Sequence, residues 1–170
     1  HRRGDMKPYL WRTNDFGATW ESLATPNIEG YVWVVLEDSK SPNLLFLGTE
    51  PGLFLSIDGG KQWAQFTSGL PMTPVRDLVV HPRDHDLVLA THGRGIYVVD
   101  DITPLRALTP EILNADFAFL PTRPGQLLIE GGGFGGVPWQ GDHEFAGASP
   151  DGGAAIAYYS KRRHVVGDGR

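Results

Sequence analysis

The fold is decided by an eight-residue stretch that occurs twice: Ser56-Ile57-Asp58-Gly59-Gly60-Lys61-Gln62-Trp63 and Thr13-Asn14-Asp15-Phe16-Gly17-Ala18-Thr19-Trp20. A hydroxyl and a carboxylate at this spacing can accept hydrogen bonds from the backbone N–H groups of a tight turn. The glycine permits a positive φ at the bend, and the tryptophan can cover the turn. Each copy therefore predicts a hairpin turn. The residues with structural roles are Thr13, Asp15, Gly17, Trp20, Ser56, Asp58, Gly60 and Trp63.

Both copies belong to a longer repeat with a period of 43 residues and no gap. Outside the turns, Val32 matches Val75, Leu44 matches Leu87 and Gly52 matches Gly95. A period near 40–45 residues, built from short strands, is typical of the four-stranded blades of a β-propeller. Helical repeats of this length are disfavoured because Gly, Pro and β-branched residues interrupt every helical window.

The repeat predicts nine strands in four classes that follow one another within a blade. Leu44–Leu47 is apolar without alternation, as expected when both faces of a strand are covered. We therefore predict an all-β fold, in which residues 1–108 are the C-terminal blades of a partial β-propeller with antiparallel strands. The strands are expected at 31–37 and 75–80, 44–48 and 87–91, 9–13, 53–57 and 96–100, and 19–23 and 62–66.

The repeat ends after the last of these strands. Val99 stands where Ser56 was, and Thr103 stands where Gly60 was, so the turn motif is lost. Residues 109–150 then predict a tail with a helical turn, a strand at 115–120 and a Gly-rich linker, after a first helical turn at 103–108. Residues 151–170 predict one more strand, at 154–159, with partners expected beyond the end of the chain.

Composition excludes several classes of protein. The 170 residues carry 15 basic and 20 acidic side chains, a net charge of −5, which argues against a general nucleic-acid binder. There is no cysteine, so a disulfide scaffold, a thiol nucleophile and a Cys-ligated metal are excluded. No apolar run in the sequence approaches the ~20 residues of a membrane-spanning helix.

Two groups of residues match known ligand-binding patterns, but local structure explains both of them better. Gly131, Gly133 and Gly136 fit the dinucleotide pattern, but Pro138 prevents the helix that the pattern requires, so no cofactor is predicted. The segment His81–Asp86 holds two imidazoles and two carboxylates. It occupies a hairpin turn, where polar residues are ordinary, so no metal is predicted.

Ligand-binding candidates follow from the alternation of turns along antiparallel strands. The motif turns and the His81–Asp86 turn are expected on one face of the blades, and the remaining loops on the opposite face. Loops on rigid scaffolds are enriched in functional residues. The polar residues of that opposite face are Glu29, Glu50, His92 and Arg94.

The repeat resembles the Asp-box (BNR-repeat) β-propellers, which include sialidases, xyloglucanase-type glycoside hydrolases, photosystem assembly factors and the sortilin/VPS10 family. The stretch Thr91–Leu105 is similar to the end of the propeller in large bacterial VPS10/sortilin-like proteins, often labelled putative glycosyl hydrolases. The resemblance covers residues 8–108 and, more weakly, 145–161. In that group the Asp box is structural and identifies no substrate.

The resemblance implies an extracellular or periplasmic scaffold that binds a glycan or a peptide. It also implies that residues 151–170 begin an Ig-like module, and that the remaining blades come from a longer parent chain or from other chains. The alternative is a segment of a sialidase- or xyloglucanase-like glycoside hydrolase whose catalytic carboxylates lie partly elsewhere. A peptide-docking assembly factor is a third reading. No catalytic set is visible in the sequence, since a glycosidase needs two carboxylates at a defined separation.

Overall fold

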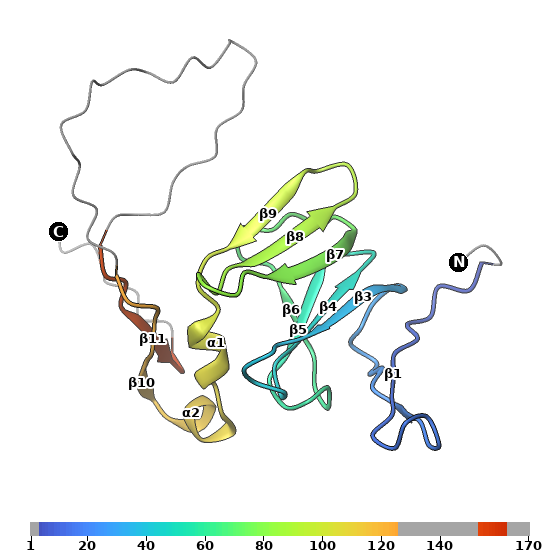
Figure 1. Ribbon diagram of the computed structural model, residues 1–170, viewed down its shortest axis with the longest axis horizontal. Coiled ribbons are helices and arrows are strands. Elements are labelled where there is room, and N and C mark those ends of the chain that lie inside the picture. The colour runs from blue at the N-terminus through green and yellow to red at the C-terminus, as the bar shows by residue number, and fades with distance from the viewer. Residues whose placement is uncertain (1–3, 126–152, 163–170) are drawn as a thin grey trace, which may run out of the picture.

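The computed structural model describes residues 4–125 and 153–162, and it is built of small antiparallel sheets with two short helices (Figure 1). We call the sheets the first hairpin (β1–β2), the middle sheet (β3–β6), the third sheet (β7–β9) and the last hairpin (β10–β11). The elements are β1 (Trp11–Arg12), β2 (Glu21–Ser22), β3 (Val32–Glu37), β4 (Leu45–Thr49), β5 (Leu53–Ser56), β6 (Ala64–Phe66), β7 (Val75–Val80), β8 (Leu87–Thr91), β9 (Ile96–Val99), α1 (Thr103–Ala107), α2 (Pro110–Asn114), β10 (Phe117–Leu120) and β11 (Ala157–Ser160).

All nine strands of the repeat form where the sequence predicts them, within a few residues at their ends. The strand-rich, antiparallel character of the fold is therefore confirmed. The described residues form no closed ring of sheets. The Gly-rich segment with Gly131, Gly133 and Gly136 lies outside the described residues. Within residues 4–125 and 153–162, no helix is long and apolar enough to cross a bilayer.

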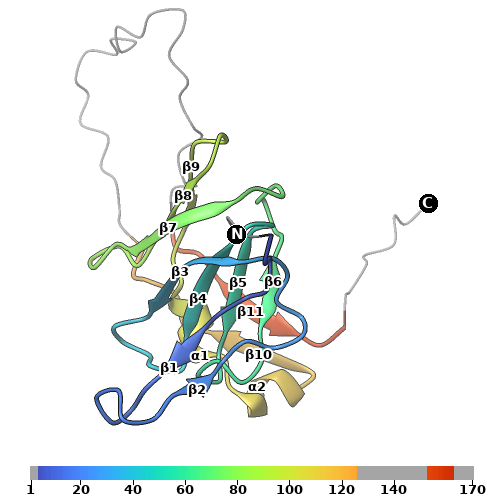
Figure 2. The ribbon, with the colours of Figure 1, turned by 90° about the vertical axis from the view of Figure 1, so that its right-hand side faces the viewer.

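The middle sheet lies between the first hairpin and the third sheet, and both of its faces are covered (Figures 1 and 2). Strand β4 is buried at every position, which confirms the prediction from its unbroken apolar run. Alternate residues of β4 and β5 face opposite ways. One face joins the third sheet in a core with the buried residues Leu44, Phe46, Leu53, Val75, Leu78, Leu87, Leu89 and Ile102. The other joins the first hairpin in a core with Leu10, Leu23, Ile28, Leu45, Leu47, Phe54 and Trp63.

The two motif turns share one hydrogen-bond pattern. In each, the first hydroxyl accepts the N–H of the motif glycine, at 2.8 Å in the first copy and 2.9 Å in the second. The carboxylates of Asp15 and Asp58 accept the N–H four residues later, at 2.8 and 3.0 Å. The hydroxyl and N–H of Thr19, with the hydroxyl of Thr13, lower the pKa of Asp15 to about 2.

The two motif tryptophans differ in what they contact. Trp63 is 3% exposed, and its Nε1–H donates to the backbone oxygen of Leu23, 3.0 Å away in the first hairpin. Trp20 is 57% exposed and donates to Gly17 within its own turn. The second tryptophan therefore ties one sheet to the preceding one, whereas the first only covers its turn.

The repeat contains a one-residue shift that the gap-free alignment missed. Val32 and Val75 occupy the same position in β3 and β7, 43 residues apart, but their partners Thr49 and Thr91 are only 42 apart. Leu87 is thus the counterpart of Leu45, and the predicted match with Leu44 is wrong. The turn before β8 is one residue shorter than its counterpart, and the turn after it is one residue longer. A shift of one residue exchanges the two faces of a strand. The gap-free alignment would therefore assign each residue of β8 to the wrong face of the third sheet.

Close approach of the middle and third sheets depends on Gly48 in β4. A Cβ at this position would lie 2.6 Å from the backbone oxygen of Val75 in β7 and 2.6 Å from a methyl of Val34. Real Cβ atoms do not approach other heavy atoms so closely. The glycine is therefore required by the contact between the two sheets.

The tail confirms the predicted helical turns and corrects the predicted strand partners. Thr109 caps α2 and Pro110 occupies its first turn, as the sequence predicts. The strand predicted at 154–159, observed at 157–160, was expected to find its partners beyond the chain, but β11 pairs with β10, Phe117 lying opposite Ser160. The pairing joins residues about 40 positions apart, and no local pattern specifies such a contact.

The second motif turn is expected to contribute measurably to stability. Asp58→Ala leaves the N–H groups of Lys61 and Gln62 without their acceptor, so the free energy of unfolding should fall by about 1–3 kcal/mol. Urea denaturation followed by tryptophan fluorescence measures the change. Asp15→Ala should be milder because the first turn is more exposed. An unchanged midpoint for Asp58→Ala would contradict the role of this turn.

Gly48→Ala should also destabilise the chain, by about 1–3 kcal/mol, because the added methyl overpacks the contact with Val75. Ala90 is the matched control: it is the counterpart of Gly48 in the third sheet, and it pairs with the 72% exposed Ile96. Ala90→Ser should change the thermal midpoint little. Equal effects of the two substitutions would show that the close approach is not specific to Gly48.

Candidate functional site

A groove of about 370 Å³ lies where three loops of the predicted ligand face meet. It is lined by the loop before β3, the turn between β4 and β5, and the loop before β7. Two of the four predicted site residues, Glu29 and Glu50, lie on this groove. The full lining is Glu29, Gly30, Glu50, Pro51, Met72, Thr73 and Pro74.

The groove is built by close backbone contacts between its loops. Gly30 has φ +69°, and a Cβ there would lie 3.1 Å from Pro51 and 3.2 Å from Glu50. The N–H of Glu50 donates to the backbone oxygen of Tyr31 at 3.2 Å. The two carboxylate-bearing loops are thereby held against each other.

The carboxylate of Glu50 is oriented by two aromatic residues. Trp33 Nε1–H donates to Glu50 Oε2 at 2.9 Å. Burial and a hydrogen bond to Glu50 raise the pKa of Tyr31, although Arg76 acts in the opposite direction. The rings of Tyr31 and Trp33 meet edge to face, with centroids 4.7 Å apart. Glu50 therefore presents a carboxylate with a defined position, whereas Glu29 is exposed in its loop.

Two β-bulges create this arrangement. The pairing of β3 with β4 skips Trp33, and the pairing of β7 with β8 skips Arg76, at equivalent positions of the repeat. The guanidinium of Arg76 lies over the Trp33 ring, 3.4 Å from its centroid. A bulge re-aims the side chain of the extra residue. The middle and third sheets are thus joined by a cation–π contact.

The other two predicted site residues lie in the next turn. The N–H of His92 donates to Pro74 at 2.9 Å, and its backbone oxygen faces the hydroxyl of Thr73 at 3.5 Å. His92 therefore adjoins the wall of the groove through its backbone. Arg94 is exposed in the same turn. The loops of this face bring Glu29 and Glu50 together on one groove. His92 and Arg94 lie in the neighbouring turn and are not part of the groove lining.

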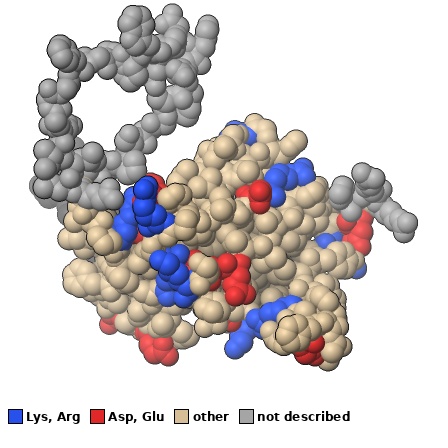
Figure 3. All heavy atoms as spheres, in the orientation of Figure 1, with Lys and Arg blue, Asp and Glu red and all other residues tan. Residues whose placement is uncertain are grey.

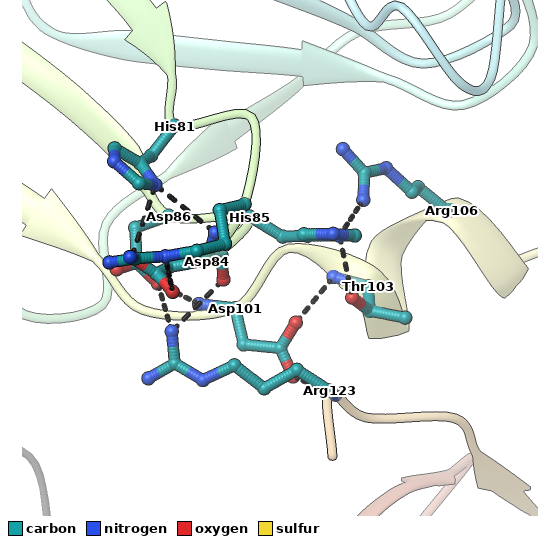
Figure 4. A network of polar contacts seen from close by, with 9 residues as sticks. His81, Asp84, His85, Asp86, Asp101, Thr103, Arg106 and Arg123 are labelled. Atoms are coloured by element: carbon teal, nitrogen blue, oxygen red, sulfur yellow. Dashed lines mark hydrogen bonds and ion pairs between the residues drawn. The ribbon is translucent and has the colours of Figure 1, made fainter. Parts of the chain in front are cut away.

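The His81–Asp86 turn lies on the opposite face, and the polar side chains of this turn form hydrogen bonds and ion pairs with other residues of the chain (Figure 4). Arg123 donates to the Asp86 carboxylate at 2.7 Å and to the backbone oxygen of Asp84 at 2.9 Å. His81 Nδ1 accepts the N–H of Asp84. Among residues 4–125 and 153–162, no three His, Asp or Glu side chains are grouped to hold a metal ion.

A second ion pair on this face links α1 to the middle sheet. Arg106 Nε and Nη2 donate to the two carboxylate oxygens of Asp38, at 2.9 and 2.7 Å. Asp38 is 1% exposed. Burial raises the pKa of Asp38, but Arg106 and the N–H groups of Lys40 and Ser41 bring it below its usual value.

Sequence reasoning missed the aromatic support of Glu50 and both arginine contacts. Arg106 and Asp38 are 68 residues apart, and Arg123 and Asp86 are 37 apart. Charged residues at such separations carry no spacing signal. Trp33 and Arg76 are separated by one repeat, which could have indicated that they occupy equivalent positions in neighbouring sheets. The hydrophobic pattern did not predict the two bulges that bring their side chains together.

Charged side chains on the face shown in Figure 3 occur as small groups of both signs rather than as one extended patch. This distribution agrees with the modest net charge of −5.

A scan of protein-family models finds no match to this chain, and searches of curated proteins and of solved structures find none either.

Replacing Glu50 should change the ionisation of Tyr31. In Glu50→Gln the negative charge that opposes phenolate formation is lost, so the pKa of Tyr31 should fall toward its ordinary value of about 10. An alkaline titration by NMR, with the tyrosine ring signals assigned, measures the change. Glu29→Gln should leave Tyr31 unchanged, and an unchanged Tyr31 in Glu50→Gln would contradict the described contact.

Proposed function

We propose that this chain is part of an Asp-box β-propeller and acts as an extracellular or periplasmic scaffold that binds a ligand in the groove of Glu29 and Glu50. The propeller assignment is supported by the shared hydrogen bonds of the two motif turns and by the stacking of successive sheets. The ligand assignment is supported by the position of the groove, on loops of a rigid sheet framework. The observation that carries it is the meeting of Glu29 and Glu50 on one groove.

The third sheet supports the proposal that more blades belong to the complete assembly. The face of the third sheet that points away from the middle sheet carries exposed apolar residues. The residues one repeat earlier, Leu36, Leu53 and Leu55 in the middle sheet, belong to the core between the middle and third sheets. Among the described residues, no strand lies beside β9, where β6 lies beside β5 in the middle sheet. Propellers take ~4–8 blades, and the additional ones come from a longer parent chain or from other chains. The exposed apolar residues, between 52% and 72% exposed, are Val79, Ile96 and Val98.

The groove favours a peptide that carries a basic side chain. Two carboxylates line it without a lysine or arginine among the lining residues, and charge-assisted hydrogen bonds are stronger than neutral ones. Pro51, Met72 and Pro74 supply apolar walls for the aliphatic part of such a side chain. A glycan can also donate hydroxyl hydrogens to the same carboxylates, but it gains no charge pairing.

A glycoside hydrolase is the second candidate, and the same pair of carboxylates favours it. Glycosidases place two carboxyl groups on either side of the scissile bond, and Glu29 and Glu50 belong to different loops of one groove. In this role one carboxyl protonates the leaving group and the other acts as nucleophile or base. Hydrolysis of aryl glycosides that is lost in both Glu29→Gln and Glu50→Gln would support it.

Binding is tested by NMR titration of the whole chain with three probes: acetyl-Gly-Gly-Lys-Gly-Gly-amide, the same peptide with Gln in place of Lys, and cellotetraose. We expect shifts at Met72 and Glu50 with the lysine peptide and weaker shifts with the other two probes. Glu50→Gln should weaken lysine-peptide binding about tenfold, since a hydrogen bond to a charged group contributes ~1.5–3 kcal/mol.

The matched control is Glu37→Gln in β3, because Glu37 is exposed and pairs with Leu45 far along the strand from the groove. It should bind like the unaltered chain. Equal affinity for the lysine and glutamine peptides would contradict a basic-peptide site, and stronger binding of cellotetraose would favour the glycan reading.

A further inference from the structure

The junction between α1 and the sheets contains a histidine with a cation at each ring nitrogen. His85 Nδ1 contacts Arg106 Nη1 of α1, and Thr103 Oγ1 lies 3.4 Å from the same nitrogen. On the other side of the ring, His85 Nε2 lies 3.0 Å from Lys40 Nζ, in the turn between β3 and β4. Figure 4 shows the ring of His85 directed toward Arg106 and Thr103.

The backbone of His85 belongs to the same junction. Its φ is +62°, a conformation that residues other than glycine rarely adopt. Its carbonyl oxygen accepts the N–H of Ile102, 2.8 Å away at the start of α1. Ile102 is fully buried in the core between the middle and third sheets. His85 therefore contacts the start of α1 through its backbone as well as α1 itself through its ring.

The imidazole must be neutral in this arrangement. Lysine and arginine are donors only, and a neutral imidazole offers one nitrogen that accepts. Either tautomer satisfies one of the two cations, whereas an imidazolium offers no acceptor and adds a third positive charge. The carboxylates nearby do not compensate fully, because Asp38 is engaged by Arg106 and Asp101 accepts the N–H groups of Thr103 and Arg123.

We propose that His85 is an acid-sensitive latch for α1: the neutral ring holds α1 against the turns of the middle and third sheets, and protonation of the ring releases it. The groups that face the ring come from three elements. They are Lys40 and Asp38 in the middle-sheet turn, Thr103 and Arg106 in α1, and Asp101 just before α1.

The direction of the pH dependence follows from proton binding. Burial lowers the pKa of His85, Arg106 and Lys40 lower it further, and Asp101 and Asp38 oppose them in part. The docked state therefore binds the proton less tightly than the released state, where the pKa returns toward ~6.5. Docking is complete above that value and weakens as the pH falls through the lower pKa of the docked state.

The effect is confined to α1, because the ion pair that holds α1 uses the same Arg106 guanidinium that contacts the His85 ring, whereas the attachment of the following segment does not involve this ring. Arg123 binds Asp86 and the backbone of Asp84, and its N–H donates to Asp101. Burial raises the pKa of Asp101, but hydrogen bonds from Thr103 and from the N–H of Arg123 bring it below its usual value, so this carboxylate stays charged in mildly acidic solution. Acid thus loosens the helix while the strand segment behind it remains tied.

The test is amide hydrogen exchange by NMR on the whole chain between pH 7.5 and 4.5, with rates expressed as protection factors. The amides of Leu105 and Arg106, which donate to Ile102, should lose protection several-fold as the His85 ring signals report protonation. In His85→Gln this acid-dependent loss should vanish, and in His92→Gln it should persist. Persistence of the loss in His85→Gln, or protection that is unchanged while His85 protonates, overturns the proposal.

A second variant keeps the test decisive if His85→Gln disturbs folding. Lys40 is exposed, so Lys40→Met removes one of the two cations without opening the core. The ring should then protonate at higher pH, and the loss of α1 protection should move with it. A transition in Lys40→Met at the same pH as in the unaltered chain contradicts the latch.

Discussion

Burial of both faces of the middle sheet is the constraint on which the rest of the structure depends. Strand β4 has no exposed position, so the sheet is stable only with a layer on each side. The first hairpin supplies one layer and the third sheet the other. Between the first hairpin and the middle sheet, the hydrogen bond from Trp63 to Leu23 holds the two layers together. Between the middle and third sheets, Gly48 permits the close approach of the strands.

The stacking also positions the candidate site. Because the sheets are related by the repeat, their bulges fall at the same height, and Trp33 and Arg76 meet across the interface. Trp33 then orients Glu50 at the end of the strands. A groove on this face is thus a consequence of sheet-on-sheet packing, and its acidic lining agrees with the proposed recognition of a basic peptide.

The opposite face serves attachment. Two arginines from the tail, Arg106 and Arg123, bind carboxylates in equivalent turns of the middle and third sheets. These ion pairs lie at the ends of the core, close to apolar residues. Removing one member of such a pair would leave the other charge without a partner in a partly buried place, which is strongly destabilising. The proposed histidine latch lies beside the first of these pairs, where Arg106 and Lys40 both approach the ring of His85. The candidate groove and the attachment of α1 therefore lie at opposite ends of the same strands.

The sequence by itself determined the local structure of this protein. Each motif turn encodes its own acceptors and its glycine within eight residues, and unbroken apolar runs mark the buried strands, so turns and strands were predicted within a few residues. The alternation of loops also predicted that Glu29 and Glu50 share a face. Where the alignment was wrong, in β8, the cause was a turn one residue shorter, which changes the face of a strand without changing its composition.

Only the tertiary structure decided which distant residues meet. The pairing of β10 with β11, the contact of Arg76 with Trp33 and the docking of Arg106 on Asp38 join residues tens of positions apart. Such contacts depend on how tightly two surfaces pack and on the register between them. Neither quantity is a property of any short stretch of chain.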